Sequence, residues 1–157
     1  MFKKILVANR GEIALRAVRE CREMGIKSVA VFSDKDAEAL FKKNADEAYP
    51  LGDPEPNASY LNIEKIMGIA EKTQAEAIYP GYGFLAENPK FVEACEAKGI
   101  VFIGPPSYSM HEAKPKHKSR DLMKKNGVPV SPGSDGAIDD ASGMAKAFEV
   151  ADSIGYP

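Results

Sequence analysis

The sequence contains few of the residues that build metal centres and disulfide frameworks. Its 157 residues include no tryptophan, two histidines and two cysteines, and neither Cys21 nor Cys95 forms a CxxC pair. A zinc site or a thioredoxin-like motif is therefore not supported. Both cysteines fall within apolar helical stripes, so we expect two reduced, buried thiols in a cytoplasmic protein.

Long apolar runs and a strong charge of one sign are also missing. The apolar run near the N-terminus extends only from Ile5 to Ala8, which is too short for a signal peptide or a membrane span. Lys and Arg total 21 and Asp and Glu total 23, giving a formal net charge of −2. We therefore expect neither a membrane nor a nucleic acid as a partner. The length favours one domain, over residues 1–157.

The chain alternates short apolar segments with amphipathic ones. Strands are expected near residues 5–8, 28–32, 47–51, 75–79 and 100–103. Helices are expected near residues 11–24, 37–43, 63–70, 89–98, 107–114, 116–126 and 139–154. The apolar positions of the last helix, which we expect to be buried, are Met144, Ala147, Phe148, Ala151 and Ile154. The alternation predicts an α/β fold, a Rossmann-like open parallel sheet with helices on both faces.

In such a sheet, ligands bind at the carboxyl ends of the strands, which here directs attention to loops 9–11, 79–88 and 104–107. In the first loop, Gly11 at a helix start would let a ligand approach free backbone N–H groups. The dinucleotide fingerprint GxGxxG is missing, which disfavours a dinucleotide-binding oxidoreductase. Glu12 in the first helical turn also disfavours an anionic ligand. The simpler interpretation is a tight strand-to-helix turn.

The second loop is the better candidate for a binding site. Gly81 and Gly83 flank Tyr82 at the end of a predicted strand, and glycine permits backbone conformations that other residues resist. Gly83 would allow a flat ligand to approach closely, and Tyr82 would cover a small ring. The alternative is a structural turn with Phe84 and Leu85 packed beneath it. The residues alone leave both interpretations open.

A cationic cluster follows the last predicted strand. Its members are Lys114, Lys116, His117, Lys118 and Arg120. Such a run is usually a solvated helix face, but a lysine on its flexible stem can also reach a polyphosphate. Position alone does not select one of these cations. No paired histidine or carboxylate has metal-ligand spacing, and no GxSxG elbow supports a nucleophilic serine.

Five strings of the sequence occur in an order and at a spacing typical of one family. They are KILVANRGEIALR at 4–16, SYLN at 59–62, PGYGFLAEN at 80–88, FIGP at 102–105 and NGVPVSPGSDG at 126–136. Together they resemble the N-terminal domain of biotin carboxylases, which are the carboxylase parts of acetyl-CoA, propionyl-CoA and pyruvate carboxylases. The resemblance covers nearly the whole chain.

The resemblance implies a reaction, its cofactors and its partners. In the family, ATP and bicarbonate form carboxyphosphate, and the carbon dioxide that it releases is captured by a ureido nitrogen of biotin. Mg²⁺ or Mn²⁺ bridges the phosphates. The biotin is carried by a carboxyl carrier protein or domain, and a carboxyltransferase uses the product. The enzyme is expected to be a homodimer.

The resemblance also implies which residues of this chain belong to the site. Tyr82 and Gly83 fall in the loop near the biotin ring, and Lys116 aligns with a lysine that contacts ATP. The helix surface used in family dimers corresponds to Arg16, Arg19 and Glu23. The ATP-grasp and C-terminal domains are expected beyond residue 157. The isolated chain is therefore expected to hold no catalytic residue and to be inactive, because the groups that stabilise carboxyphosphate lie there.

The sequence departs from the family pattern at three places. Tyr79 stands where the family usually has His, and Ala86 where it usually has Ser. The segment Ala-Lys-Pro-Lys at 113–116 replaces Met-Gly-Asp-Lys, so Lys114 competes with Lys116 as the ATP ligand. Two alternatives remain, the first domain of an ATP-grasp ligase of purine or carbamoyl phosphate synthesis, and a non-catalytic dimerisation module. The string PGYGFLAEN argues against the first.

Overall fold

The computed structural model describes residues 1–113, 116–134, 136–138 and 143–156. The chain divides into two compact units, Met1–Met110 and His111–Pro157. Within the described residues, no helix is both long enough and apolar enough to cross a membrane.

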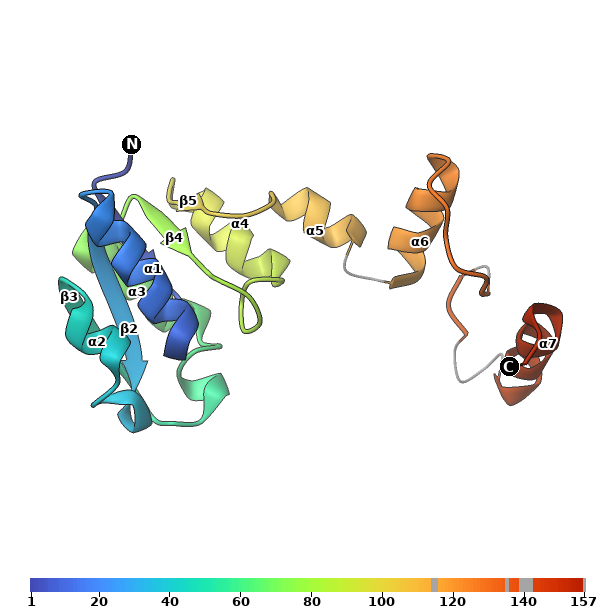
Figure 1. The fold of residues 1–157 in the computed structure, drawn as a ribbon, viewed down its shortest axis with the longest axis horizontal. Helices are drawn as coiled ribbons and strands as arrows, with labels where there is room; N and C mark the ends of the chain where they lie inside the picture. The colour runs from blue at the N-terminus through green and yellow to red at the C-terminus, as the bar shows by residue number, and fades with distance from the viewer. Residues whose placement is uncertain (114–115, 135, 139–142, 157) are drawn as a thin grey trace. The chain divides into compact units, whose positions relative to one another are not determined.

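The first unit is built on one parallel sheet of five strands in the order β3-β2-β1-β4-β5 (Figure 1). The strands are β1 (Lys4–Val7), β2 (Lys27–Ser33), β3 (Glu47–Gly52), β4 (Ala77–Tyr79) and β5 (Val101–Phe102). All four pairings are parallel, with Leu6 of β1 opposite Val29 of β2 and Ile78 of β4. The predicted α/β class with an open parallel sheet is confirmed.

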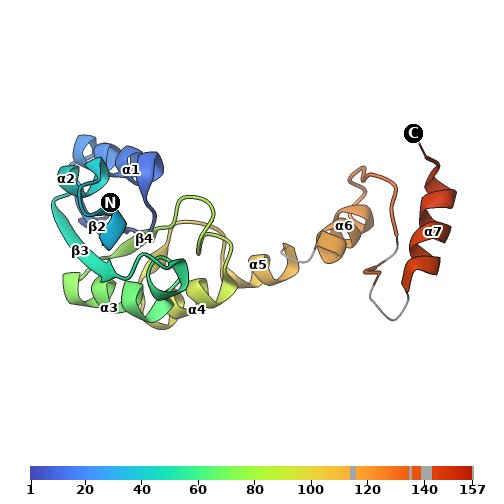
Figure 2. The same ribbon diagram turned by 90° about the horizontal axis from the view of Figure 1, so that it is seen from below.

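Helices cover both faces of this sheet. On one face lie α1 (Gly11–Glu23) and α2 (Leu40–Asn44), and on the other α3 (Ile63–Thr73) and α4 (Pro89–Ala97) (Figure 2). Successive side chains of a strand point to opposite faces, so β1 contributes to both layers. Val7 packs with Val18 of α1, whereas Leu6 belongs to the core that contains Ile66 of α3. Two short 3₁₀ turns, Asp34–Asp36 and Pro56–Ala58, complete the unit.

The helix ends follow the signals in the sequence. Asn88 caps α4, since its side chain accepts a hydrogen bond from the N–H of Lys90 at 3.0 Å, and Pro89 is the first helical residue. Asn62 caps α3 in the same way, by accepting from the N–H of Lys65. Gly25 follows α1 with a φ of +70°, in the left-handed region that favours glycine after a helix.

The two thiols are buried and unpaired, as expected. Cys95 packs at 3.8 Å from the sulfur of Met67, and burial raises the pKa of its thiol to about 11. Burial is also the first cause of the raised pKa of Cys21. Both thiols are therefore protonated at neutral pH and poor nucleophiles.

The last three helices are α5 (Ser107–Ala113), α6 (Lys116–Lys125) and α7 (Gly143–Ile154). The prediction that the last helix buries its apolar face is wrong. Met144 is 72% exposed and Phe148 58% exposed, and no described residue of α7 is buried. The predicted start of this helix, at 139–142, lies outside the described residues.

The helix predicted at 37–43 begins later, at Leu40. Residues 37–39 are not helical and follow the 3₁₀ turn Asp34–Asp36, in which the side chain of Asp36 accepts a hydrogen bond from the hydroxyl of Ser33 at 3.0 Å. A side-chain bond of this kind offers the backbone an alternative to the helix.

A candidate binding turn at the carboxyl ends of two strands

The ends of β1 and β4 form the topological switch point of the sheet. The chain leaves β1 for β2 on one side and later returns to β4 on the other, so the loops after these two strands diverge above neighbouring strands. Ligands of open α/β sheets bind at such points. The loop after β4 is named here the binding turn and comprises residues 80–84.

Asn9 joins the loop after β1 to the binding turn. Its side chain is 2% exposed, and its Nδ2 donates to the carbonyl oxygens of Pro80 at 2.8 Å and of Tyr82 at 2.9 Å. The Oδ1 of Asn9 accepts from the N–H of Arg10 at 2.8 Å. The first two loops proposed from the sequence are therefore parts of one structure.

The two glycines of the binding turn have different roles. Both have a left-handed backbone, with φ of +66° at Gly81 and +67° at Gly83. A Cβ at Gly81 would lie 2.7 Å from Cγ2 of Ile13 and 2.8 Å from Nδ2 of Asn9. A Cβ at Gly83 would meet nothing within 4 Å. Gly81 is thus required by packing, whereas Gly83 leaves open space beside Tyr82, which is 67% exposed.

The far end of the binding turn rests on Tyr60. The ring of Phe84 stacks on the ring of Tyr60 with centroids 5.2 Å apart, although Phe84 has a φ of +42°, which is uncommon for an aromatic residue. Leu85 beneath it is 2% exposed. Of the packing proposed as the alternative for this loop, the burial of Leu85 is present, whereas Phe84 stacks on Tyr60 but remains 36% exposed. Tyr82 and Gly83 of the same loop are exposed, so the interpretation as a structural turn and the interpretation as a binding site are compatible.

Tyr60 is itself held by hydrogen bonds. Its hydroxyl donates to Oδ2 of Asp36 at 2.7 Å and accepts from the N–H of Ser33 at 3.1 Å. Burial, followed by the bond to Asp36, raises the pKa of Tyr60 above its ordinary value. Arg10 approaches the same carboxylate, with Nη1 3.5 Å from Oδ2.

These residues surround a hollow of about 500 Å³ at the strand ends. Its walls are Asn9, Arg10, Gly11, Glu12, Ile13, Asp36, Tyr82, Gly83 and Phe84. An exposed aromatic ring beside bare glycine backbone suits a flat ligand, and Arg10 adds a cation at the rim. Such a set of groups can bind and orient a ligand.

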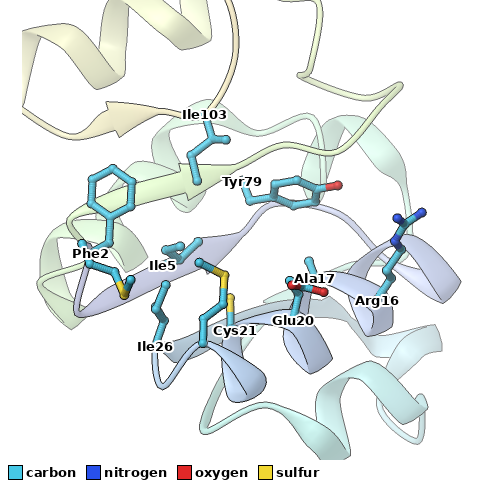
Figure 3. A pocket seen from close by; sticks show the side chains of 11 residues that line it. Phe2, Ile5, Arg16, Ala17, Glu20, Cys21, Ile26, Tyr79 and Ile103 are labelled. Carbon is cyan, nitrogen blue, oxygen red and sulfur yellow. The ribbon is translucent and has the colours of Figure 1, made fainter.

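A second hollow, of about 700 Å³, lies between α1 and strands β1 and β4 (Figure 3). Its lining is mostly apolar, with Ile5, Cys21 and Ile103 on its walls and with Arg16 and Glu20 among its residues. The three residues predicted for a dimer surface, Arg16, Arg19 and Glu23, are all exposed on α1, and Arg16 also lines this hollow.

The cationic cluster divides into two kinds of residue. Lys116 is exposed at the start of α6, and Lys118 is exposed further along it. Arg120 is engaged within its own unit, since its guanidinium donates to the carbonyl oxygens of Ser131 at 3.1 Å, Gly133 at 3.2 Å and Ser134. Lys114 and Pro115 lie outside the described residues. No group of three His, Cys, Asp or Glu suited to a metal occurs in the part of the chain that the structure describes.

The third loop proposed from the sequence is bound to α4. The hydroxyl of Ser107 donates to Oε2 of Glu96 at 2.9 Å.

Sequence reasoning did not identify the roles of Asn9 and Tyr60. A polar Asn directly after a buried strand was the available signal for the first. Tyr60 lies in the string SYLN at 59–62, but that string gave it no role.

Comparison with known proteins decides the family. A family model described as the biotin carboxylase N-terminal domain matches residues 1–110. The chain belongs to the biotin carboxylase N-terminal domain family. The resemblance proposed from the five strings is confirmed.

Relatives of this biotin carboxylase domain match all 157 residues. A pyruvate carboxylase subunit from Methanothermobacter thermautotrophicus is 57% identical, and the match covers 31% of that protein. Biotin carboxylase 1 of Bacillus subtilis is 46% identical, with 34% of that protein covered. The chain thus spans about a third of the length of the curated relatives that it matches.

Solved structures agree with this assignment. The biotin carboxylase domain dimer of Hydrogenobacter thermophilus 2-oxoglutarate carboxylase, in complex with MgADP, ADP and bicarbonate, is 50% identical with a TM-score of 0.92. The β-γ-ATP complex of Campylobacter jejuni biotin carboxylase is 48% identical with a TM-score of 0.93. Each match covers 100% of this chain and 34% of the other.

The two glycines of the binding turn give a direct test of its packing. Alanine at either position costs about 1–2 kcal/mol for the left-handed backbone. Only Gly81→Ala adds a collision with Asn9 and Ile13, which should cost about 1–3 kcal/mol more. Urea unfolding should therefore rank Gly81→Ala as clearly less stable than Gly83→Ala, and equal losses would contradict the packing.

The hydroxyl of Tyr60 is tested by Tyr60→Phe, which keeps the ring. Because the buried N–H of Ser33 loses its acceptor, we expect a loss of about 1–3 kcal/mol at neutral pH. The pKa of Tyr60 is raised in the fold, so the unfolded chain ionises first, near its ordinary pKa of about 10. The stabilisation is present below that pH and falls as the pH rises above it. In urea unfolding, the difference in the free energy of unfolding between wild type and Tyr60→Phe should become smaller above about pH 10. A difference that does not change with pH would contradict this role of the hydroxyl.

Proposed function

We propose that this chain is the N-terminal part of an enzyme that carboxylates biotin with ATP and bicarbonate. The observation that carries the proposal is the match of all 157 residues to relatives named as carboxylases, at identities up to 57%. The binding turn supports it independently, because its exposed Tyr82 and open Gly83 suit the flat ring of biotin.

The cofactors proposed for the whole enzyme are ATP, Mg²⁺ or Mn²⁺, bicarbonate, and biotin on a carrier protein. Related structures are complexes with MgADP and bicarbonate and with β-γ-ATP. When bound, ATP supplies the phosphoryl group that activates bicarbonate. Of the described residues, Lys116 is the exposed cation proposed to contact ATP. The described residues offer no set of three metal ligands, so we assign no metal ligand to this chain.

For the residues of the binding turn we propose contact with the biotin ring. Tyr82 would cover one face of the ring, and Gly83 would let the ring approach the backbone, since no side chain fills that space. Neither residue has an acid–base role in this proposal. Their part is to orient the ring, which lowers the barrier by placing the reacting atoms.

The proposed partners are a biotin carboxyl carrier protein or domain, a carboxyltransferase and a second copy of the enzyme. The surface proposed for the second copy is that of Arg16, Arg19 and Glu23 on α1. In a dimer with two-fold symmetry, the same surface of each copy faces that of the other. Basic side chains of the helix in one copy can therefore form ion pairs with acidic side chains of the same helix in the other copy. The related 2-oxoglutarate carboxylase domain is a dimer.

Neither of the other two candidates is advanced. A ligase of purine or carbamoyl phosphate synthesis and a non-catalytic dimerisation module are favoured by no observation. The family model that matches 70% of the chain, residues 1–110 of 157, is that of biotin carboxylases.

The test is bicarbonate-dependent ATP cleavage stimulated by free biotin, measured on the full-length enzyme. Tyr82→Ala should raise the KM for biotin about tenfold, the effect of losing one aromatic contact. The KM for ATP should stay within about twofold, since ring contact does not involve the nucleotide. Tyr108→Ala is the matched control, because Tyr108 is 72% exposed and lies outside the binding turn.

Two results would contradict the proposal. One is an unchanged KM for biotin in Tyr82→Ala. The other is robust biotin-stimulated turnover by the 157-residue chain alone, which we expect to be inactive.

A further inference from the structure

We propose that Asn9 and Tyr60 are positioning residues that hold the binding turn at its two ends and so set Tyr82 and Gly83 for biotin. The inference rests on the proposed function. It adds two residues, one from the end of β1 and one from the loop before α3, that the sequence did not assign to the site.

The first anchor uses the full hydrogen-bonding capacity of an asparagine. Both protons of the Asn9 amide are donated, to the carbonyls of Pro80 and Tyr82 on either side of Gly81, and its oxygen accepts from the chain. Asn9 is 2% exposed and its bond to the carbonyl of Pro80 is buried, so water competes little for that bond. An aspartate of the same shape would place an acceptor against two other acceptors.

The second anchor is the stacked ring of Tyr60. Phe84 has a left-handed backbone at φ +42°, a conformation that persists only where the surroundings stabilise it. The ring of Tyr60 supplies that support at 5.2 Å. The bonds of the Tyr60 hydroxyl to Asp36 and Ser33 fix the ring in turn.

Tyr82 and Gly83 lie between the two anchors and are exposed. A loop held only by one end would have to be ordered when the ligand binds, and that ordering weakens binding. Here the turn is ordered before the ligand arrives, and the N–H of Ala86 closes it by donating to the carbonyl of Gly83 at 2.8 Å. The anchors therefore act on the affinity for biotin and leave the affinity for nucleotide unchanged.

The test is Asn9→Asp, read out in two ways. In the 157-residue chain, hydrogen exchange at the N–H of Ala86 should become about tenfold faster or more, because the turn opens more often. In the full-length enzyme, the KM for free biotin should rise about tenfold or more, as for a misplaced binding group. The KM for ATP should stay within about twofold, which a general loss of structure would not allow.

The matched control is Ser28→Ala. Ser28 is 1% exposed, and its hydroxyl donates to Asp46 at 2.8 Å, so the change also removes a partly buried hydrogen bond, made by a residue of β2. It contacts neither anchor in the hydrogen bonds of the described residues. In the Ser28→Ala variant, the hydrogen-exchange rate at the N–H of Ala86 and the KM for biotin should equal those of the wild type.

Tyr60 supplies a second pair of variants, which decides the matter if Asn9→Asp does not fold. Tyr60→Leu removes the stack and should raise the KM for biotin. Tyr60→Phe keeps the stacked ring and should raise the KM for biotin less than Tyr60→Leu does.

The outcomes separate this inference from the proposed function. Faster exchange together with a raised KM for biotin supports it. Unchanged exchange, or an unchanged KM for biotin, overturns it. If Tyr82→Ala still raises that KM, only the positioning role has failed. If Tyr82→Ala has no effect either, the assignment of the turn to biotin has failed as well.

Discussion

The carboxamide of Asn9 connects the ends of two neighbouring strands, and the geometry of the site depends on it. Its two donated hydrogen bonds reach across the switch point of the sheet to the carbonyls of Pro80 and Tyr82. Because the amide is nearly inaccessible to water, breaking these bonds would leave the amide and the buried carbonyl of Pro80 unpaired. Gly81 follows from the same constraint, since only a residue without a Cβ can lie so close to that amide.

The sheet provides the rigid base for this contact. β1 is central, with β2 and β4 as its neighbours, and its side chains are buried against helices on both faces. Its carboxyl end is therefore one of the best-fixed points of the fold, and Asn9 extends directly from it. The binding turn is thus held by rigid elements although its tip is exposed, an arrangement that suits a binding site.

Much of the fold could be predicted from the sequence because its signals are local. The buried run at 5–8, the helical spacing after it and the cap at Asn88 each depend on a few adjacent residues. The same holds for Gly81 and Gly83, whose spacing around Tyr82 indicated an unusual turn. These features need no knowledge of what lies nearby in space.

What could not be predicted depends on contacts between distant residues. Asn9 and Tyr82 are 73 positions apart, and Ser33 and Tyr60 are 27 apart, so neither bond has a pattern in the sequence. Arg120 belonged to an apparent cationic cluster, yet it binds the carbonyls of a loop eleven and more residues later. The apolar face of α7 has the periodicity of a buried helix, but Met144 and Phe148 on that face are exposed.

We propose that the turn after β4, held by Asn9, receives the biotin ring. A crystal structure of the full-length enzyme with biotin, bicarbonate and MgADP tests it most directly. We expect the ring of biotin to contact Tyr82 and the backbone of Gly83, with both Asn9 bonds intact. A biotin ring bound elsewhere, with Tyr82 in solvent, would contradict it.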